Sequence, residues 1–225
     1  MEIKAKFANL KSFLKKEKTE AIKDKIEINP DVFYDAEELK RIESMTEFTG
    51  DIHFTNAISE DIPYFYLNRV NGNVVIENCD SGWILLHLSE ITGNLIIKNS
   101  DIAWNGDLDK IGGDLIINDS RLMYMNTLSD IDGNLIIKNS DIDGLIGLLN
   151  IGENVVLDEA RVFGLLRLWN VGKNFKVCDS DICISIPKLR KFAGDKIIKN
   201  STLNQKYVKK YIAKNQKSNE NERGM

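Results

Sequence analysis

A twelve-residue motif occurs twice in this sequence, and the distance between its copies restricts the fold more than any other feature. ITGNLIIKNSDI (residues 91–102) returns as IDGNLIIKNSDI (residues 131–142), with eleven of twelve positions identical and the copies forty residues apart. Aligning the chain on the Gly-Asn pair of this motif exposes more divergent copies. The eight aligned pairs, spaced by 20 to 22 residues, are Gly50-Asp51, Gly72-Asn73, Gly93-Asn94, Gly113-Asp114, Gly133-Asn134, Glu153-Asn154, Lys173-Asn174 and Gly194-Asp195. A period this constant indicates a solenoid, in which each copy is one coil that buries its apolar side against its neighbours.

The apolar residues of each coil indicate which positions face the interior. We number positions from the opening apolar residue, which is Ile91 in the third coil. Positions 5 and 7 are apolar in nearly every coil, as at Leu95 and Ile97, and this two-residue period is typical of a strand. We therefore predict one short strand per coil, and these strands stack into a parallel sheet. Position 10 is small, as at Ser100, where we expect a tight inward turn, and position 12 is aliphatic again, as at Ile102.

Positions 3 and 4 predict the turn that enters the strand. The glycine at position 3 is expected to adopt a backbone conformation that other residues resist. Glu153 and Lys173 replace it in two coils, and in each of them the preceding residue is a glycine. The Asn or Asp at position 4 is expected to form a stacked polar ladder that hydrogen-bonds its own turn.

The repeat also resembles a known family. Its pattern VxGxLxIxxSxI, in units of twenty residues, resembles the short bacterial and phage leucine-rich-repeat-like units of the form VGGNLDLSGTxIxSLP, and more distantly receptor L domains. The resemblance covers roughly residues 48–203 and implies a binding scaffold with no catalytic residues to carry over. In two respects the chain departs from the family: late prolines occur only at Pro63 and Pro187, and position 10 is mostly Ser or Ala instead of Asn. An open leucine-rich horseshoe and a closed right-handed β-helix both remain compatible with the pattern.

Both terminal regions are expected to cap the solenoid, because end coils would otherwise expose core. Residues 1–47 form the N-terminal cap, with one amphipathic helix and a second short helix that Asp35-Ala36-Glu37-Glu38 opens with an acidic first turn. The apolar residues of the first helix are Phe7, Leu10 and Leu14. Residues 204–225 form a basic helix and a disordered tail after the β-solenoid of residues 48–203. The prediction is a mainly β, single-domain, right-handed parallel β-solenoid of about eight coils with α-helical caps.

Several classes of protein are excluded by simple patterns. No run of eighteen apolar residues exists, and the N-terminus lacks a continuous apolar region before a cleavage site, so we expect neither a membrane span nor secretion. The three cysteines form no CxxC pair, which favours a reducing, cytoplasmic setting. His53 and His87 fall at different positions of their coils and belong to no catalytic or metal-binding motif. We therefore expect a protein that is not an enzyme and has no catalytic residues, metal or cofactor.

Position 6 should point outward from the sheet, yet five consecutive coils carry a β-branched aliphatic residue there. We call these five residues the aliphatic stripe: Val75, Ile96, Ile116, Ile136 and Val156. Adjacent strands lie about 4.8 Å apart, so the stripe would be about 20 Å long. Two interpretations stay open. A buried parallel sheet is commonly apolar on both faces, or a terminal helix covers the stripe; alternatively, an exposed stripe with polar flanks is typical of a surface for protein binding or self-association.

A second candidate surface is aromatic. Trp83, Trp104 and Tyr124 occupy position 14 of three successive coils. Such side chains either pack into a corner of the core or anchor a partner, because Trp and Tyr are favoured in interface hot spots.

Three functional hypotheses follow. The leading one is a non-enzymatic scaffold, an inhibitor or adaptor, that binds another protein or a second copy of itself through the aliphatic stripe, the position-14 aromatics, or both. The alternative is a role linked to nucleic acid, because residues 51–186 carry a net charge of −11 and residues 187–225 one of +8. The acidic body would mimic nucleic acid, or the basic segment would bind it. The third is a self-assembling structural protein that polymerises through its coil ends.

Overall fold

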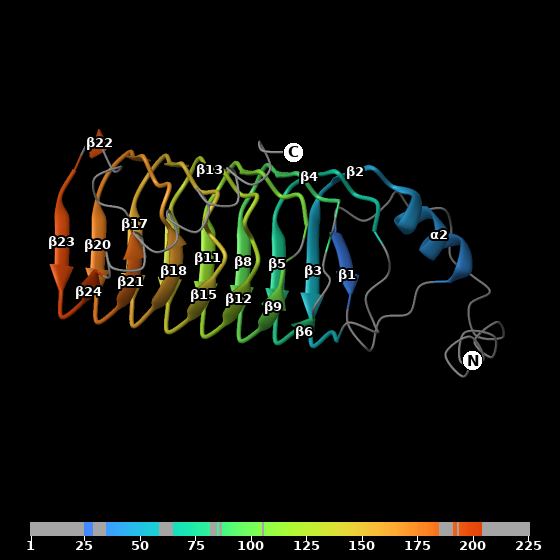
Figure 1. The fold of residues 1–225 in the computed structure, drawn as a ribbon. Coiled ribbons are helices and arrows are strands. Elements are labelled where there is room, and N and C mark those ends of the chain that lie inside the picture. The colour runs from blue at the N-terminus through green and yellow to red at the C-terminus, as the bar shows by residue number, and fades with distance from the viewer. Residues whose placement is uncertain are drawn as a thin grey trace, which may run out of the picture.

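The computed structural model describes residues 25–28, 35–58, 65–81, 85, 87–104, 106–184, 191–192 and 194–203. Within these residues the chain forms one helix and three parallel sheets that run along the molecule (Figure 1). The first sheet contains β1 (Lys25–Ile28), β3 (Asp51–Thr55), β5 (Val74–Glu77), β8 (Leu95–Lys98), β11 (Leu115–Asn118), β14 (Leu135–Lys138), β17 (Val155–Asp158), β20 (Phe175–Cys178) and β23 (Lys196–Lys199). The second sheet contains β2 (Glu47–Thr49), β4 (Arg69–Asn71), β7 (Glu90–Ile91), β10 (Lys110–Ile111), β13 (Asp130–Ile131), β16 (Asn150–Ile151), β19 (Asn170–Val171) and β22 (Lys191–Phe192). The third sheet contains β6 (Asp80–Ser81), β9 (Asp101–Ala103), β12 (Arg121–Met123), β15 (Asp141–Asp143), β18 (Arg161–Leu165), β21 (Asp181–Ile184) and β24 (Thr202–Leu203).

The predicted parallel β-solenoid is confirmed, and its coils stack in register. Each strand pairs in parallel with its counterpart in the next coil, as β11 does with β14 through Leu115 opposite Leu135. The coil of β2 and β3 supplies two strands, and the seven later coils supply three each. The prediction of one strand per coil was therefore wrong. The additional strands have as few as two residues, too short to display an alternating pattern in the sequence.

One hydrophobic cluster fills the space between the three sheets. It includes Leu115 of the first sheet, Ile111 of the second and Leu122 of the third, and all three side chains are fully buried. Positions 5, 1 and 12 of the coil thus meet in one core, as predicted. The coil is closed on three sides and is not an open horseshoe.

The glycines of position 3 are required by close stacking, and not by the unusual backbone conformation that the sequence predicted. A Cβ on Gly93 would lie 2.5 Å from the carbonyl oxygen of Gly72, and one on Gly113 would lie 2.8 Å from the backbone of Gly93. Among the described glycines only Gly50, Gly144 and Gly164 have a positive φ. The prediction was wrong for the central coils because each coil rests directly on the backbone of the one before it.

The left-handed backbone conformation occurs instead at position 9, where the chain passes from the first sheet to the third. In eight coils the residue there has a φ of 43° to 54°. These residues are Asn56, Asn78, Asn99, Asp119, Asn139, Glu159, Asp179 and Asn200. Asn and Asp tolerate this conformation better than other side chains, which accounts for their predominance at this corner.

The predicted polar ladder at position 4 is present, but it joins consecutive coils instead of bonding its own turn. The side-chain Oδ1 of each residue accepts a hydrogen bond from the backbone N–H of position 4 in the next coil. Asn94 N–H donates to Asn73 at 2.8 Å, Asp114 N–H to Asn94 at 2.7 Å, and Asn134 N–H to Asp114 at 2.6 Å.

A second ladder follows position 10, where the sequence indicated only small residues. Ser120 Oγ donates to the carbonyl of Asn118 in its own coil at 2.6 Å and accepts Ser100 N–H from the preceding coil at 3.1 Å. Ser140 repeats both contacts, with its own coil and with Ser120 N–H. Ala160 interrupts this serine ladder because it has no hydroxyl group. The buried turns are therefore held by side-chain hydroxyl groups that bridge coils.

The N-terminal end combines a predicted helix with an unpredicted strand. Helix α2 (Ala36–Ser44) begins at a capping box in which Asp35 accepts backbone N–H groups and Glu38 reaches back to Asp35 N–H, as the acidic residues 35–38 indicated. Its Ile42 joins the hydrophobic core. Strand β1 lies in the region predicted as a helical cap and extends the first sheet beside β3. The helix predicted around Phe7 and the C-terminal segment 204–225 lie outside the described residues.

Candidate protein-binding face

The aliphatic stripe lies on the outer face of the first sheet, with one member on each of β5, β8, β11, β14 and β17. Its residues are direct partners across the sheet: Val75 opposite Ile96, Ile96 opposite Ile116, Ile116 opposite Ile136, and Ile136 opposite Val156. All five side chains are half-buried, whereas the position 5 and 7 residues of the same strands are fully buried. Period-two alternation therefore predicted the orientation correctly.

No described helix lies over this stripe. The extensive contacts between elements in the described part of the chain all join strands of the same sheet. The stripe is bounded along the sheet by polar groups, His53 at one end and the exposed Lys176 at the other. Burial, and then the charge of Lys25, lower the pKa of His53 below its ordinary value. The outer face is thus apolar in its middle and polar at both ends.

The two sides of the stripe are polar as well. Position 8 supplies four charged side chains and one amide: Glu77, Lys98, Asn118, Lys138 and Asp158. Position 4 supplies the Asn and Asp ladder on the other side. A narrow apolar strip with a polar rim is the arrangement found at many protein interfaces.

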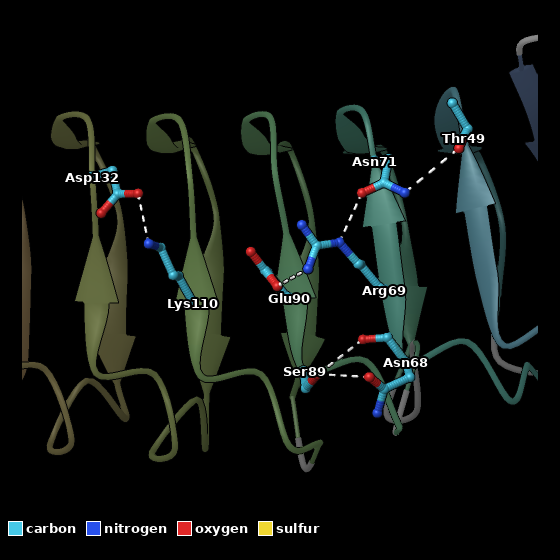
Figure 2. Close-up of polar contacts among 8 residues, drawn as sticks. All are labelled: Thr49, Asn68, Arg69, Asn71, Ser89, Glu90, Lys110 and Asp132. Carbon is cyan, nitrogen blue, oxygen red and sulfur yellow. Dashed lines mark hydrogen bonds and ion pairs between the residues drawn. The ribbon is translucent and has the colours of Figure 1, made fainter.

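The outer face of the second sheet has a different character, because its charged side chains pair with one another (Figure 2). Arg69 Nη1 lies 2.5 Å from Glu90 Oε2, and Arg69 Nε donates to Asn71 Oδ1 at 2.8 Å. Lys110 Nζ contacts Asp132 Oδ2 at 2.9 Å. The ion pairs Arg69–Glu90 and Lys110–Asp132 connect neighbouring coils, which leaves a polar face.

The outer face of the third sheet also carries charged residues, and from Asp101 to Asp181 their signs alternate from coil to coil. Arg121 Nη1 lies 3.6 Å from Asp101 Oδ2. Arg161 donates to both carboxylate oxygens of Asp141, at 2.9 Å from Nε to Oδ1 and through Nη2 to Oδ2. This pairing raises the pKa of Arg161 above its ordinary value. Among the three described outer faces, only the first sheet has a row of five aliphatic side chains.

The aromatic residues of position 14 do not form one surface. Trp104 is fully buried, so its assignment as a partner-binding residue is corrected: it packs in the core, and its Nε1 has no hydrogen-bond partner among the described residues. Tyr124 is 50% exposed and has a φ of 66°. Trp83 lies outside the described residues. Position 14 occupies a corner between sheets, where the local backbone decides the direction of the side chain.

One exposed aromatic contact was not predicted from the sequence. Tyr66, 55% exposed, stacks on His87 with ring centroids 5.5 Å apart and planes 4° apart. Both residues lie in the corner segments between sheets, which vary from coil to coil. No periodic signal marks them, since neither residue recurs at its position in other coils.

The described residues contain few groups that suggest chemistry. No three His, Cys, Asp or Glu side chains among them lie close enough together to hold a metal ion. The cysteines Cys79, Cys178 and Cys183 are free, and burial raises the pKa of the Cys79 and Cys183 thiols. Among the described residues, no helix has the length and apolar character needed to cross a membrane.

The closed coil limits how far the family resemblance extends. A leucine-rich repeat pairs one strand with a helical or irregular segment and curves into a horseshoe, whereas each central coil here has strands on three sides. The shared features are the period of about 20 residues and the apolar pattern. Comparison with protein-family models, curated proteins and solved structures found no match for this chain.

Proposed function

We propose that this protein is a non-enzymatic scaffold that binds another protein through the outer face of the first sheet. The observation that carries the proposal is the half-exposed aliphatic stripe from Val75 to Val156, which stands on one of three outer faces while the other two carry paired charges. An apolar strip of this kind, flanked by polar side chains, is characteristic of an interaction surface.

The dimensions of the stripe favour an elongated contact segment. Five strands spaced about 4.8 Å apart give a length of about 20 Å. A helix of about 14 residues has the same length, at 1.5 Å per residue. The partner would therefore lay one apolar helix face, or one extended segment, across the coils. A second copy of the chain is the other occupant that this surface would accept.

The resemblance to bacterial and phage leucine-rich-repeat-like units supports the same proposal, since that family consists of binding scaffolds. A cytoplasmic location is part of the proposal and rests on the three free cysteines, which suit a reducing compartment. Exposed Tyr124 directly follows β12 of the third sheet, so it would contribute to binding only for a partner that extends well beyond the first sheet.

Nucleic-acid mimicry receives less support from the charge arrangement. A mimic needs rows of like charge that follow phosphate spacing. On the third sheet, Asp101, Arg121, Asp141, Arg161 and Asp181 alternate in sign along consecutive coils. Neighbouring opposite charges cancel most of the field that such a row would produce.

The proposal is tested with the double variant Ile116→Lys/Ile136→Lys. Its matched control is Asn150→Lys/Asn170→Lys, which adds the same two charges in adjacent coils of the second sheet. Each protein is immobilised, proteins retained from source cells are identified by mass spectrometry, and binding of the purified candidate is measured by calorimetry. We expect the wild type and the control to bind and the stripe variant to lose at least tenfold in affinity, about 1.4 kcal/mol.

Folding is monitored by circular dichroism and thermal unfolding. Lysine stems lie readily along apolar surface with the charge in solvent, so both variants should stay folded. Equal binding by the stripe variant and its control would refute the proposed site. Unfolding of the stripe variant alone would assign position 6 to the structural core and refute it as well.

A further inference from the structure

The outer face of the third sheet is hollowed into a groove of about 430 Å³. Residues of β12, β15, β18 and β21 form its floor, so it runs across four consecutive coils. Its apolar lining includes Met123 and Phe163, which occupy position 13 of their coils. This groove is separate from the aliphatic stripe, which lies on a different sheet.

The groove has a small excess of acidic side chains beside its apolar ones. Its charged lining consists of three aspartates and two arginines, namely Asp141, Asp143, Asp181, Arg121 and Arg161. Each arginine forms an ion pair with an aspartate of the preceding coil, Arg121 with Asp101 and Arg161 with Asp141. Asp143 and Asp181, which line the groove, are in none of the ion pairs formed among the described residues. An occupant should therefore combine apolar side chains with positive charge.

The sequence that follows β24 has this composition. Strand β24 lies next to β21, which lines the groove, and residues 204–225 follow β24 directly. These 22 residues contain six Lys or Arg and two Glu, a net charge of +4. Their apolar residues at helical spacing are Tyr207, Val208, Tyr211 and Ile212. We propose that the C-terminal segment 204–225 docks in the groove of the third sheet, with its apolar side chains on Met123 and Phe163 and its lysines beside Asp143 and Asp181.

The segment is long enough for this. The four strands of the groove span about 14 Å at about 4.8 Å per strand. As a helix, 22 residues extend about 33 Å, and as an extended chain more than twice that. The same face of a second copy is the poorer occupant, because it would bring further aspartates to Asp143 and Asp181 instead of positive charge. The docked segment would cover the third sheet and leave the first sheet as the uncovered face with an apolar stripe.

The test uses the full chain with p-benzoylphenylalanine in place of Met123, whose side chain is half-buried in the groove. After illumination at low protein concentration, cross-linked peptides are mapped by mass spectrometry. We expect cross-links within one chain to residues 204–225, and none from the same probe at Ile116 on the first sheet. If the Met123 variant does not fold, exposed Arg121 carries the probe instead.

Charge is tested by Lys209→Glu/Lys210→Glu. Reversing these two charges should lower the cross-linking yield about tenfold. The matched control, Lys196→Glu/Lys199→Glu on β23, makes the same charge change on the first sheet and should leave the yield as in the wild type. Absence of cross-links to residues 204–225, cross-links between two copies, or equal yields from the two reversal variants would each overturn the inference.

Discussion

Substituting Ser120 with Ala removes one hydroxyl group from the serine ladder and tests whether side chains hold the coils together. Ser120 Oγ accepts the N–H of Ser100 at 3.1 Å and donates to the carbonyl of Asn118 at 2.6 Å. That carbonyl also accepts Asn99 N–H, so it stays bonded in the variant. Ser100 N–H loses its acceptor in the variant, because Ser100 is only 5% exposed and water cannot replace the lost hydroxyl.

The expected cost is that of one buried, unsatisfied N–H group, about 1–3 kcal/mol. The chain offers the reverse change at Ala160, which stands in the same position two coils later and is 3% exposed. Serine fits this position in the neighbouring coils at Ser140 and Ser180. A new hydroxyl at residue 160 would accept Ser140 N–H, and Ala160→Ser should therefore stabilise the protein by about 1 kcal/mol.

Equilibrium unfolding in urea measures both variants, and amide hydrogen exchange assigns the effect to a residue. Ser120→Ala should accelerate exchange at Ser100, and Ala160→Ser should slow it at Ser140. The two sites are two coils apart, so the double variant should show the sum of the single effects. If Ser120→Ala unfolds at the same urea midpoint as the wild type, or if Ala160→Ser destabilises the protein, the hydroxyl groups do not contribute to stability and the reasoning is refuted.

Two further predictions concern the turns and the end of the stripe. Gly133→Ala places a Cβ 2.7 Å from the backbone of the preceding coil, so it should lower the free energy of unfolding by about 1–3 kcal/mol. Lys173→Ala, at the same coil position, should change the free energy of unfolding little. Urea titration measures both variants, and equal effects would exclude close stacking as the reason for the glycine. Burial and then Lys25 lower the pKa of His53, so below the ordinary pKa of 6.5 the unfolded chain binds more protons at this residue than the folded chain does. The free energy of unfolding should therefore keep its full value above pH 6.5 and fall as the pH drops below it. Unfolding of wild type and His53→Gln at pH 7.5 and 5.5 checks this, and an identical pH dependence in both would exclude His53 as the cause.

The parts of the fold that repeat with period two were predictable from the sequence. Leu95 and Ile97 alternate with Ile96, and this alternation correctly placed two residues in the core and one outside. Helix α2 was predictable because Asp35 and Glu38 form a local capping box. Local patterns succeed where the stabilising contacts are close in sequence.

The other features depend on coil stacking. Strands of the second and third sheets contribute as few as one buried residue per coil, which no alternation reveals. Position 14 carries an aromatic residue in neighbouring coils, yet Trp104 is buried and Tyr124 is half exposed. The sequence showed that the two positions share an aromatic residue, and the packing of each corner decided whether the side chain is buried or exposed.

The sequence by itself determined the length of the coil, the residues that face its interior and the aliphatic stripe on its outer face. Each of these follows from the repeating pattern of residue types along the chain. Only the tertiary structure decided why position 3 is glycine, to which coil the Asn and Ser side chains bond, and which outer faces carry ion pairs. These interactions join residues twenty positions apart, such as Ser100 and Ser120. They exist only once the coils are stacked, because stacking brings residues of equal position within hydrogen-bond distance.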